Sequence, residues 1–293
     1  MTIKHIVISG GGPTGLMSYG AAKYLHEESF WNLKDIISIH GTSIGSLIGV
    51  LISLNMNWED LDDYLIKRPW EKIVEITPDD FLNVFYTKGI VNNNIINIVV
   101  EYLLKVNEID IAVTMKEFYE ITKIELNLYT VEINKFEKKV INHNTYPDLK
   151  VIDGIKMSCA FPILFQPIIE GEYCYLDGGL MCNYPINECL ESQKCEENEI
   201  LGFRNMSNTS VNNVDEETKL LQYIYCLNSK IISYIDNESN YKKIPYEVNC
   251  IDKCQGKYME WFETFTSIEK RKAFIEEGIT YGKLFYQYYK QMK

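Results

Sequence analysis

Several features are scarce or missing in this sequence of 293 residues. No run of about 20 apolar residues occurs, so the sequence predicts no membrane-spanning helix. Basic residues number 29 against 41 acidic ones, and the net charge of -12 opposes binding to nucleic acid, or to an anionic membrane by charge alone. The first residues lack the pattern of a signal peptide, which predicts a cytoplasmic or otherwise intracellular protein, soluble or held peripherally at a membrane.

Cysteine patterns for disulfides or metals are also missing. Most of the 8 Cys stand singly, as do Cys159, Cys182 and Cys226, and we expect reduced thiols. Cys250 and Cys254 are spaced Cys-x-x-x-Cys, but no second Cys or His pair completes a zinc site. The sequence therefore predicts no structural metal.

What is present is an ordinary globular composition, with 46% hydrophobic and 24% charged residues. Strand and helix patterns alternate in the first half of the chain. Apolar β-branched runs at 5–9 and 36–40 predict strands, and apolar residues at helical spacing predict helices at 16–28 and 44–54. This alternation predicts a parallel sheet with right-handed crossovers.

The later segments are less regular. Residues 58–110 have a mainly helical pattern, typical of an insertion or cap over the sheet. Further strands are expected at 124–133, 137–142, 167–176, 199–204 and 245–251, further helices at 148–159, 218–236 and 267–293, and a linker at 205–217.

A glycine-rich loop, Gly10 to Gly15, follows the first strand and opens the first helix. Its bare backbone N–H groups and the helix N-terminus can hold a phosphate or the oxyanion of an acyl-transfer intermediate. This glycine pattern is close to that of the FAD loop of flavin monooxygenases, so a flavin or dinucleotide oxidoreductase is one alternative. A dinucleotide site also requires an acidic residue at the end of the second strand. Here that strand ends at His40 and Gly41, and Asp35 lies before the strand, at its wrong end. A purely structural glycine turn is a further alternative.

The second motif, Gly41-Thr42-Ser43-Ile44-Gly45, lies between an apolar strand and an apolar helix. Gly-x-Ser-x-Gly in this setting is typical of a nucleophile elbow, a strained turn that exposes the serine and places the next N–H, that of Ile44, near the oxyanion. The alternative is a tight turn in which Ser43 only caps the helix.

A serine nucleophile needs a base. Of the four His, only His143 has a free setting, and none resembles a triad histidine near the C-terminus. Asp177 ends a short strand and precedes Gly178 and Gly179, so its carboxylate can reach Ser43 directly. An ordinary Asp-Gly turn is the alternative.

Taken in order, these motifs resemble those of the patatin-like phospholipases. The matching blocks are the loop Gly10–Gly15, the elbow Gly41–Gly45, the segment Ser158–Pro167, and Asp177-Gly178-Gly179 followed by Asn183 and Pro185. The resemblance covers residues 4–205, and the C-terminal third matches no family that we can name. It implies a catalytic domain at 1–205 that includes the 58–110 cap, with 206–293 as a helical extension packed on it.

The resemblance implies a three-layer α/β/α fold with a mainly parallel sheet, and hydrolysis of phospholipid or lysophospholipid esters by a Ser–Asp dyad. Carried over by position, Ser43 is the nucleophile and Asp177 the general base. The backbone N–H groups of Gly11, Gly12 and Ile44 form the oxyanion hole, and no metal or cofactor is required. A catalytically silent lipid-binding protein on the same fold is the main alternative.

One departure concerns Thr14, which stands where the family often has Lys or Arg. It predicts a weaker positive charge near the oxyanion or the head group.

The resemblance also implies contact with a lipid surface. Candidates are the region around Phe81, Phe85 and Tyr86, and the C-terminal helix with Lys270-Arg271-Lys272 beside Phe274 and Phe285, unless that helix packs its apolar stripe on the core. The oligomeric state is left open.

Overall fold

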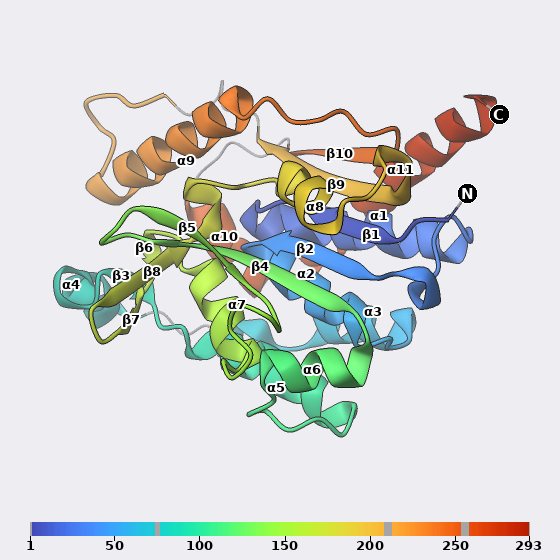
Figure 1. Ribbon diagram of the computed structural model, residues 1–293. Helices are drawn as coiled ribbons and strands as arrows, with labels where there is room; N and C mark the ends of the chain where they lie inside the picture. The colour runs from blue at the N-terminus through green and yellow to red at the C-terminus, as the bar shows by residue number, and fades with distance from the viewer. Residues whose placement is uncertain (1, 74–76, 208–212, 253–257, 293) are drawn as a thin grey trace.

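A mixed β-sheet with helices on both faces forms the frame of the protein (Figure 1). The computed structural model describes residues 2–73, 77–207, 213–252 and 258–292. In spatial order the sheet contains β10 (Glu247–Asp252), β9 (Ile200–Ser207), β1 (His5–Ile8), β2 (Ser38–Thr42), β4 (Glu125–Glu132), β8 (Tyr173–Asp177) and β7 (Ile168–Glu170), and β5 (Glu137–Ile141) also pairs with β4. The strands from β10 to β4 are parallel to their neighbours, whereas β5, β7 and β8 pair antiparallel. The predicted three-layer, mainly parallel architecture is confirmed.

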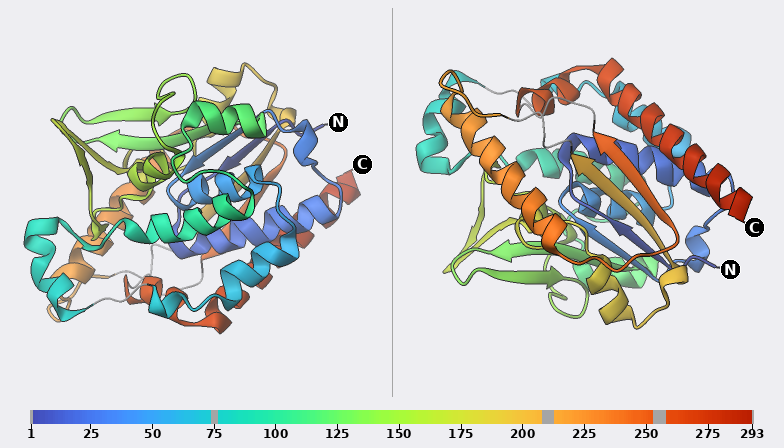
Figure 2. Two further views of the ribbon diagram at one scale, coloured as in Figure 1. Left: turned by 90° about the horizontal axis from the view of Figure 1, so that it is seen from below. Right: turned by 90° about the horizontal axis from the view of Figure 1, so that it is seen from above.

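The helices form the outer layers (Figure 2). One face carries α1 (Gly15–Glu27), α2 (Ile44–Ser53) and α7 (Val151–Cys159), with α3 (Trp58–Lys67), α5 (Asn94–Val106), α6 (Met115–Thr122) and α11 (Ile268–Met292) further out or alongside. The opposite face carries α8 (Ile186–Gln193) and α9 (Leu220–Glu238). α11 packs along α1, so the C-terminal segment contacts the first βαβ unit.

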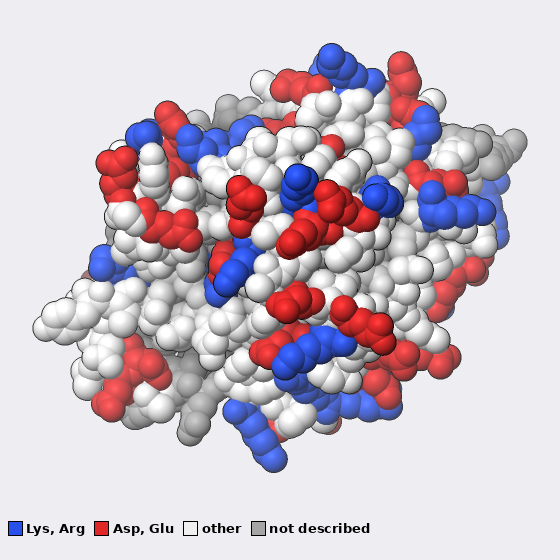
Figure 3. All heavy atoms as spheres, turned by 60° about the horizontal axis from the view of Figure 1, so that its bottom comes forward, with Lys and Arg blue, Asp and Glu red and all other residues white. Residues whose placement is uncertain are grey.

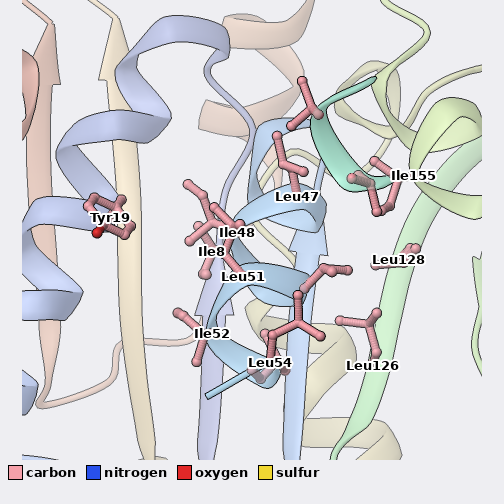
Figure 4. Close-up of a cluster of buried hydrophobic side chains, with 14 of the residues drawn as sticks. Ile8, Tyr19, Leu47, Ile48, Leu51, Ile52, Leu54, Leu126, Leu128 and Ile155 are labelled. Atoms are coloured by element: carbon pink, nitrogen blue, oxygen red, sulfur yellow. The ribbon is translucent and has the colours of Figure 1, made fainter. Parts of the chain in front are cut away.

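The main core lies between the sheet and α2 (Figure 4). Side chains alternate along β1: Ile6 and Ile8 enter this core, and Val7 enters a smaller cluster under α8. The α2 side chains Leu47 and Leu51 are buried in this core, whereas Gly45 and Gly49 face the sheet. Burying one aliphatic side chain of this size contributes about 1.5–3 kcal/mol, so this interface fixes the first two strands relative to α2.

The 58–110 segment forms α3, α4 (Pro78–Thr87), β3 (Gly89–Val91) and α5. β3 pairs in parallel with β6 (Ile163–Phe165) in a separate two-stranded sheet, and α5 packs on α7. This segment therefore contacts the helical layer and the chain just before β7.

Some local expectations were incomplete. The helices α6, α8 and α10 (Tyr258–Thr266) were not anticipated. α6 and α8 have only eight residues each, too few for a periodic pattern to stand out. Residues 205–207 belong to β9 and not to the predicted linker, whereas 208–212 lie outside the described residues. The polar composition of this stretch misled the prediction, because a parallel strand continues there beside β10.

The C-terminal helix packs on the domain. Arg271 is 3% exposed and donates hydrogen bonds to the backbone carbonyls of Ile66 and Phe265, among others. Phe274 and Phe285 pack against the core. Arg271 is thus unavailable to a lipid head group.

The surface carries both signs of charge. On the face shown in Figure 3, acidic and basic side chains are interspersed, without a continuous basic patch. Within the described ranges, no helix has both the length and the apolar character required to cross a bilayer.

Candidate active site

Ser43 lies at the turn from β2 into α2, with φ 54° and ψ -125°. A non-glycine residue held at positive φ costs about 1–3 kcal/mol, and such strain concentrates at functional sites. The flanking glycines are required by close packing. A Cβ on Gly41 would lie 2.4 Å from the carbonyl oxygen of Gly45, and one on Gly45 would lie 2.3 Å from that of Ile8. The Gly-x-Ser-x-Gly pattern is therefore a steric requirement of this turn.

A buried serine holds the turn in place. The Ser158 hydroxyl accepts a hydrogen bond from the Ser43 N–H at 3.0 Å and donates one to the Tyr129 carbonyl at 2.6 Å. It also contacts the Ser46 hydroxyl at 2.8 Å, which in turn donates to the Gly41 carbonyl. Ser158, on α7, thereby links the elbow to β4.

The register of β4 brings Asp177 next to Ser43. Thr42, the last residue of β2, is opposite Tyr129, and Asp177, the last residue of β8, is opposite Thr130. β5 pairs with one edge of β4, so β8 must pair with the opposite edge, which is the edge that β2 also pairs with. The pairing with β8 therefore begins along that edge where the pairing with β2 ends. The carboxylate thus follows directly after the elbow in space.

The Asp177 carboxylate is almost fully buried, at 2% exposure. Oδ1 accepts a hydrogen bond from the Gly179 N–H at 2.8 Å. Burial raises the pKa of Asp177 to about 6, against the lowering effects of the Ser43 hydroxyl and the Gly179 N–H. Oδ2 nevertheless has no hydrogen-bond partner of ordinary geometry in the described chain, so the Ser43 hydroxyl is close to the carboxylate without a well-formed bond to it.

The glycine loop presents backbone N–H groups beside this pair. The Gly10 N–H donates a hydrogen bond to the Asn183 carbonyl at 3.0 Å, whereas the N–H groups of Gly11 and Gly12 donate to no group in the described chain. Gly12 has φ 57°, which favours glycine, and a Cβ there would lie 2.1 Å from the Trp261 ring. The Ile44 N–H belongs to the first turn of α2, where helical partners are lacking.

Two polar side chains fix the loop from behind. Asn205 donates from Nδ2 to the Ser9 carbonyl at 3.2 Å, and its backbone N–H donates to the Ser9 hydroxyl at 2.7 Å. The buried Thr14 hydroxyl donates to the Gly11 carbonyl at 2.8 Å. Thr14 is therefore a structural residue of the loop.

These elements surround a cavity of about 170 Å³ that opens to solvent. Its lining consists of Gly10, Gly11, Gly12, Thr14, Ser43, Phe161, Asp177, Asn183, Arg204, Asn205, Met206, Tyr225, Ser229, Ile232, Ser233, Asp236, Asn237 and Trp261. The other motif residues, Gly15, Gly41, Ile44, Gly45, Gly178 and Gly179, are not part of this lining. Among the described residues, none from 58–110 lines it.

The histidines make contacts elsewhere. His40 is fully buried, bonds to the Tyr129 hydroxyl at 2.8 Å, and has its pKa lowered to about 3 by burial. The His143 ring stacks on Tyr119 with centroids 3.9 Å apart. No histidine is among the described lining residues. The ionisable group next to the Ser43 hydroxyl in this lining is the Asp177 carboxyl.

Several residues of the site were missed in the sequence. Asn205 fell in the presumed linker, and Arg204 carried no motif signal. Trp261 lies in the C-terminal third, which resembles no family that we can name. Ser158 was only part of a matching block, because its role depends on contacts with β4 and the elbow.

The dinucleotide-binding alternative finds little support in the geometry. A dinucleotide site requires an acidic residue at the end of β2, but Thr42 and Ser43 occupy this position. The described residues contain no group of three or more His, Cys, Asp or Glu side chains that could hold a metal ion. Cys254, the partner in the Cys-x-x-x-Cys spacing, lies outside the described residues.

Comparison with known proteins places the chain in a known class. Residues 6–190 match the patatin-like phospholipases, and the chain belongs to that family. It is 27% identical over 190 residues to the probable lipid hydrolase 463L of Invertebrate iridescent virus 6, which covers 64% of this chain and 63% of the relative. It is 22% identical over 186 residues to the uncharacterized protein R571 of Acanthamoeba polyphaga mimivirus, covering 63% and 60%. The chain thus spans about three fifths of these relatives.

Among solved structures, VipD from Legionella pneumophila has a similar fold. The TM-score is 0.57 at 17% identity, over 97% of this chain and 67% of that one. The likeness extends through the C-terminal third, for which sequence reasoning found no relative.

Proposed function

We propose that this protein is a lipid acyl hydrolase that cleaves carboxylic esters of phospholipids or lysophospholipids. The observation that carries the proposal is that Ser43 and Asp177 line one cavity together with the Gly11 and Gly12 N–H groups, which donate to no group among the described residues. A carboxylate with a pKa near 6 is ionised at neutral pH and is still basic enough to accept a proton during attack.

In the proposed acylation step, the Ser43 hydroxyl attacks the ester carbonyl carbon and Asp177 accepts its proton. The tetrahedral oxyanion accepts hydrogen bonds from the N–H groups of Gly11, Gly12 and Ile44, each worth about 3 kcal/mol by analogy with other oxyanion holes. The C–O bond then breaks, and the departing alkoxide takes the proton from Asp177. This leaves an acyl ester on Ser43 and a free alcohol.

In the second step, water donates a proton to Asp177 as its oxygen attacks the acyl carbonyl. Collapse of the intermediate releases the fatty acid and returns the proton to Ser43. No histidine takes part in either step, so the contacts of His40 with Tyr129 and of His143 with Tyr119 stay unchanged.

The proposed lipid contact is supported by α9. On α9, Leu220, Tyr223, Leu227, Ile231 and Tyr234 are exposed, from 41% for Ile231 to 66% for Tyr234. Their spacing of three and four residues puts them on one face, and the opposite face lines the cavity. Lys230 is the sole charged residue between 220 and 235. A nearly neutral apolar stripe beside the site fits the surface of a zwitterionic lipid layer better than an anionic one.

The test of the proposed function is fatty-acid release from phospholipids, lysophospholipids and neutral glycerides. Wild type should release fatty acid from at least one phospholipid class, and Ser43→Ala and Asp177→Asn should not, with or without a chelator. Folded wild type that binds lipid vesicles but releases no fatty acid would instead favour the silent lipid-binding alternative.

The lipid contact has a separate test. Leu227→Ser with Tyr234→Ser should weaken binding to phosphatidylcholine vesicles, measured by sedimentation. Ile121→Ser, at an exposed position on α6, is the matched control and should bind as wild type does. Equal binding by all three proteins would exclude α9 as the contact.

A further inference from the structure

A charged pair lies in the wall of the catalytic cavity without a part in the chemistry described above. Arg204 on β9 donates from Nη2 to Oδ2 of Asp236 on α9 at 2.7 Å. The Tyr241 hydroxyl donates to the other carboxylate oxygen at 2.6 Å. The guanidinium also stacks 4.9 Å from the Tyr241 ring centroid and 5.8 Å from that of Tyr184. The pair is thereby held in one arrangement.

The guanidinium retains capacity for another ligand. Of its N–H groups, only Nη2 has a hydrogen bond within the described chain, and the buried Nε has no partner. A guanidinium has five N–H donors, and an ionised carboxylate has about four acceptor positions. Both side chains reach the cavity, at 19% exposure for Arg204 and 15% for Asp236. An under-used charged donor in a cavity is a site for an anionic group.

Arg204 is the one cation among the described residues that line the cavity. The glycine loop, Gly10 to Gly15, contains no cation, and the Thr14 hydroxyl donates to the Gly11 carbonyl. The positive charge of the cavity lining is thus on β9, on another wall than the glycine loop.

We propose that the Arg204–Asp236 pair is the head-group site for a zwitterionic phospholipid. This inference rests on the proposed function. The phosphodiester faces the unused Nη1 N–H groups of Arg204, and the ammonium group faces Asp236, so each charge of the head group meets its opposite. An anionic head group without an ammonium would meet Asp236 uncompensated, in a protein of net charge -12. A neutral glyceride would leave the guanidinium without a ligand.

The first experiment measures selectivity. We expect Arg204→Gln to lower kcat/KM for phosphatidylcholine about 10- to 100-fold, mainly through KM, which is the range for a lost hydrogen bond to a charged group. The loss on a diacylglycerol should be several-fold smaller, so the phosphatidylcholine-to-diacylglycerol ratio falls. Asp236→Asn should raise the ratio of phosphatidylglycerol to phosphatidylcholine hydrolysis. Lys67→Gln removes an exposed cation on α3 and should alter neither ratio.

A second experiment separates this inference from the proposed function. Binding of dissolved dihexanoyl-phosphatidylcholine is measured by calorimetry on Ser43→Ala, with and without Arg204→Gln, with melting curves to show that both variants fold. Weaker binding in the double variant supports the head-group site even if no hydrolysis is found. Equal binding, or equal loss on phospholipid and diacylglycerol, would overturn it while leaving Ser43-dependent hydrolysis intact.

Discussion

Replacing Asp177 by asparagine should make the protein more stable while removing its activity. The cause is the buried charge: Asp177 is 2% exposed, and burial raises its pKa from 3.8 to about 6. An acid whose folded-state pKa is raised destabilises the fold once it ionises, because the unfolded chain releases the proton more easily. Below pH 3.8 both states are protonated and the cost vanishes, and above about pH 6 the cost is complete.

The magnitude follows from the shift. About 2.2 pKa units at 1.36 kcal/mol each give a cost of about 3 kcal/mol at pH 8 and about 1 kcal/mol at pH 4.5. Asparagine keeps an oxygen to accept from the Gly179 N–H and carries no charge. For a chain of 293 residues, about 3 kcal/mol corresponds to a rise in Tm of about 5 °C.

The assay is thermal unfolding of wild type and Asp177→Asn at pH 8 and pH 4.5. Asp148→Asn, at an exposed position, is the control and should change Tm by less than about 1 °C at either pH. Hydrolysis by Asp177→Asn should fall at least about 100-fold. A variant that is less stable than wild type at pH 8, or equally changed at both pH values, would refute the reasoning.

Three further predictions concern the same site. The kcat/KM of wild type should be constant above about pH 7 and fall about tenfold per unit below pH 6, as Asp177 becomes protonated; a profile flat down to pH 4.5 would contradict its role as base. Ser158→Ala should lower the free energy of unfolding by about 1–3 kcal/mol in urea titrations and also lower kcat, because the Ser43 N–H loses its acceptor. Gly45→Ala should cost about 3 kcal/mol or more, since its Cβ would lie 2.3 Å from a carbonyl oxygen, whereas Gly171→Ala, in open space at φ 59°, should cost about 1–2 kcal/mol. Equal losses for the two glycine variants would contradict the steric argument.

The parts of the fold that sequence could predict are those with local causes. The β-branched runs and apolar helices of the first half have strong periodicity, and Gly41, Gly45 and Ser43 carry a pattern imposed by one tight turn. Ser43 and Asp177 could be singled out because each follows a predicted strand. That they are neighbours follows from the register of β4, which no local pattern contains.

The parts that could not be predicted depend on tertiary contacts. Asn205 lies in a polar stretch typical of a linker, yet its side chain supports the glycine loop some 195 residues earlier. Arg204 could not be recognised as a site residue from the sequence, because its partner Asp236 is brought next to it only by the packing of α9. A cap at 58–110 was a reasonable expectation from its helical pattern, but composition does not indicate that the cavity wall comes from α9 and Trp261 instead.

The pairing of Thr42 and Asp177 with consecutive residues of β4 has a consequence for how this chain can vary. Ser43 and Asp177 are 134 positions apart in the sequence, 177 minus 43, but the residues of β4 opposite Thr42 and Asp177 are consecutive. Their spacing is set by backbone pairing at β4, with Ser158 of α7 holding the turn at Ser43, and no described residue of 58–110 lines the cavity. Segments such as 58–110 can therefore be lengthened, shortened or replaced while Ser43 and Asp177 keep their separation, which leaves the outer layer free to adapt to new surroundings.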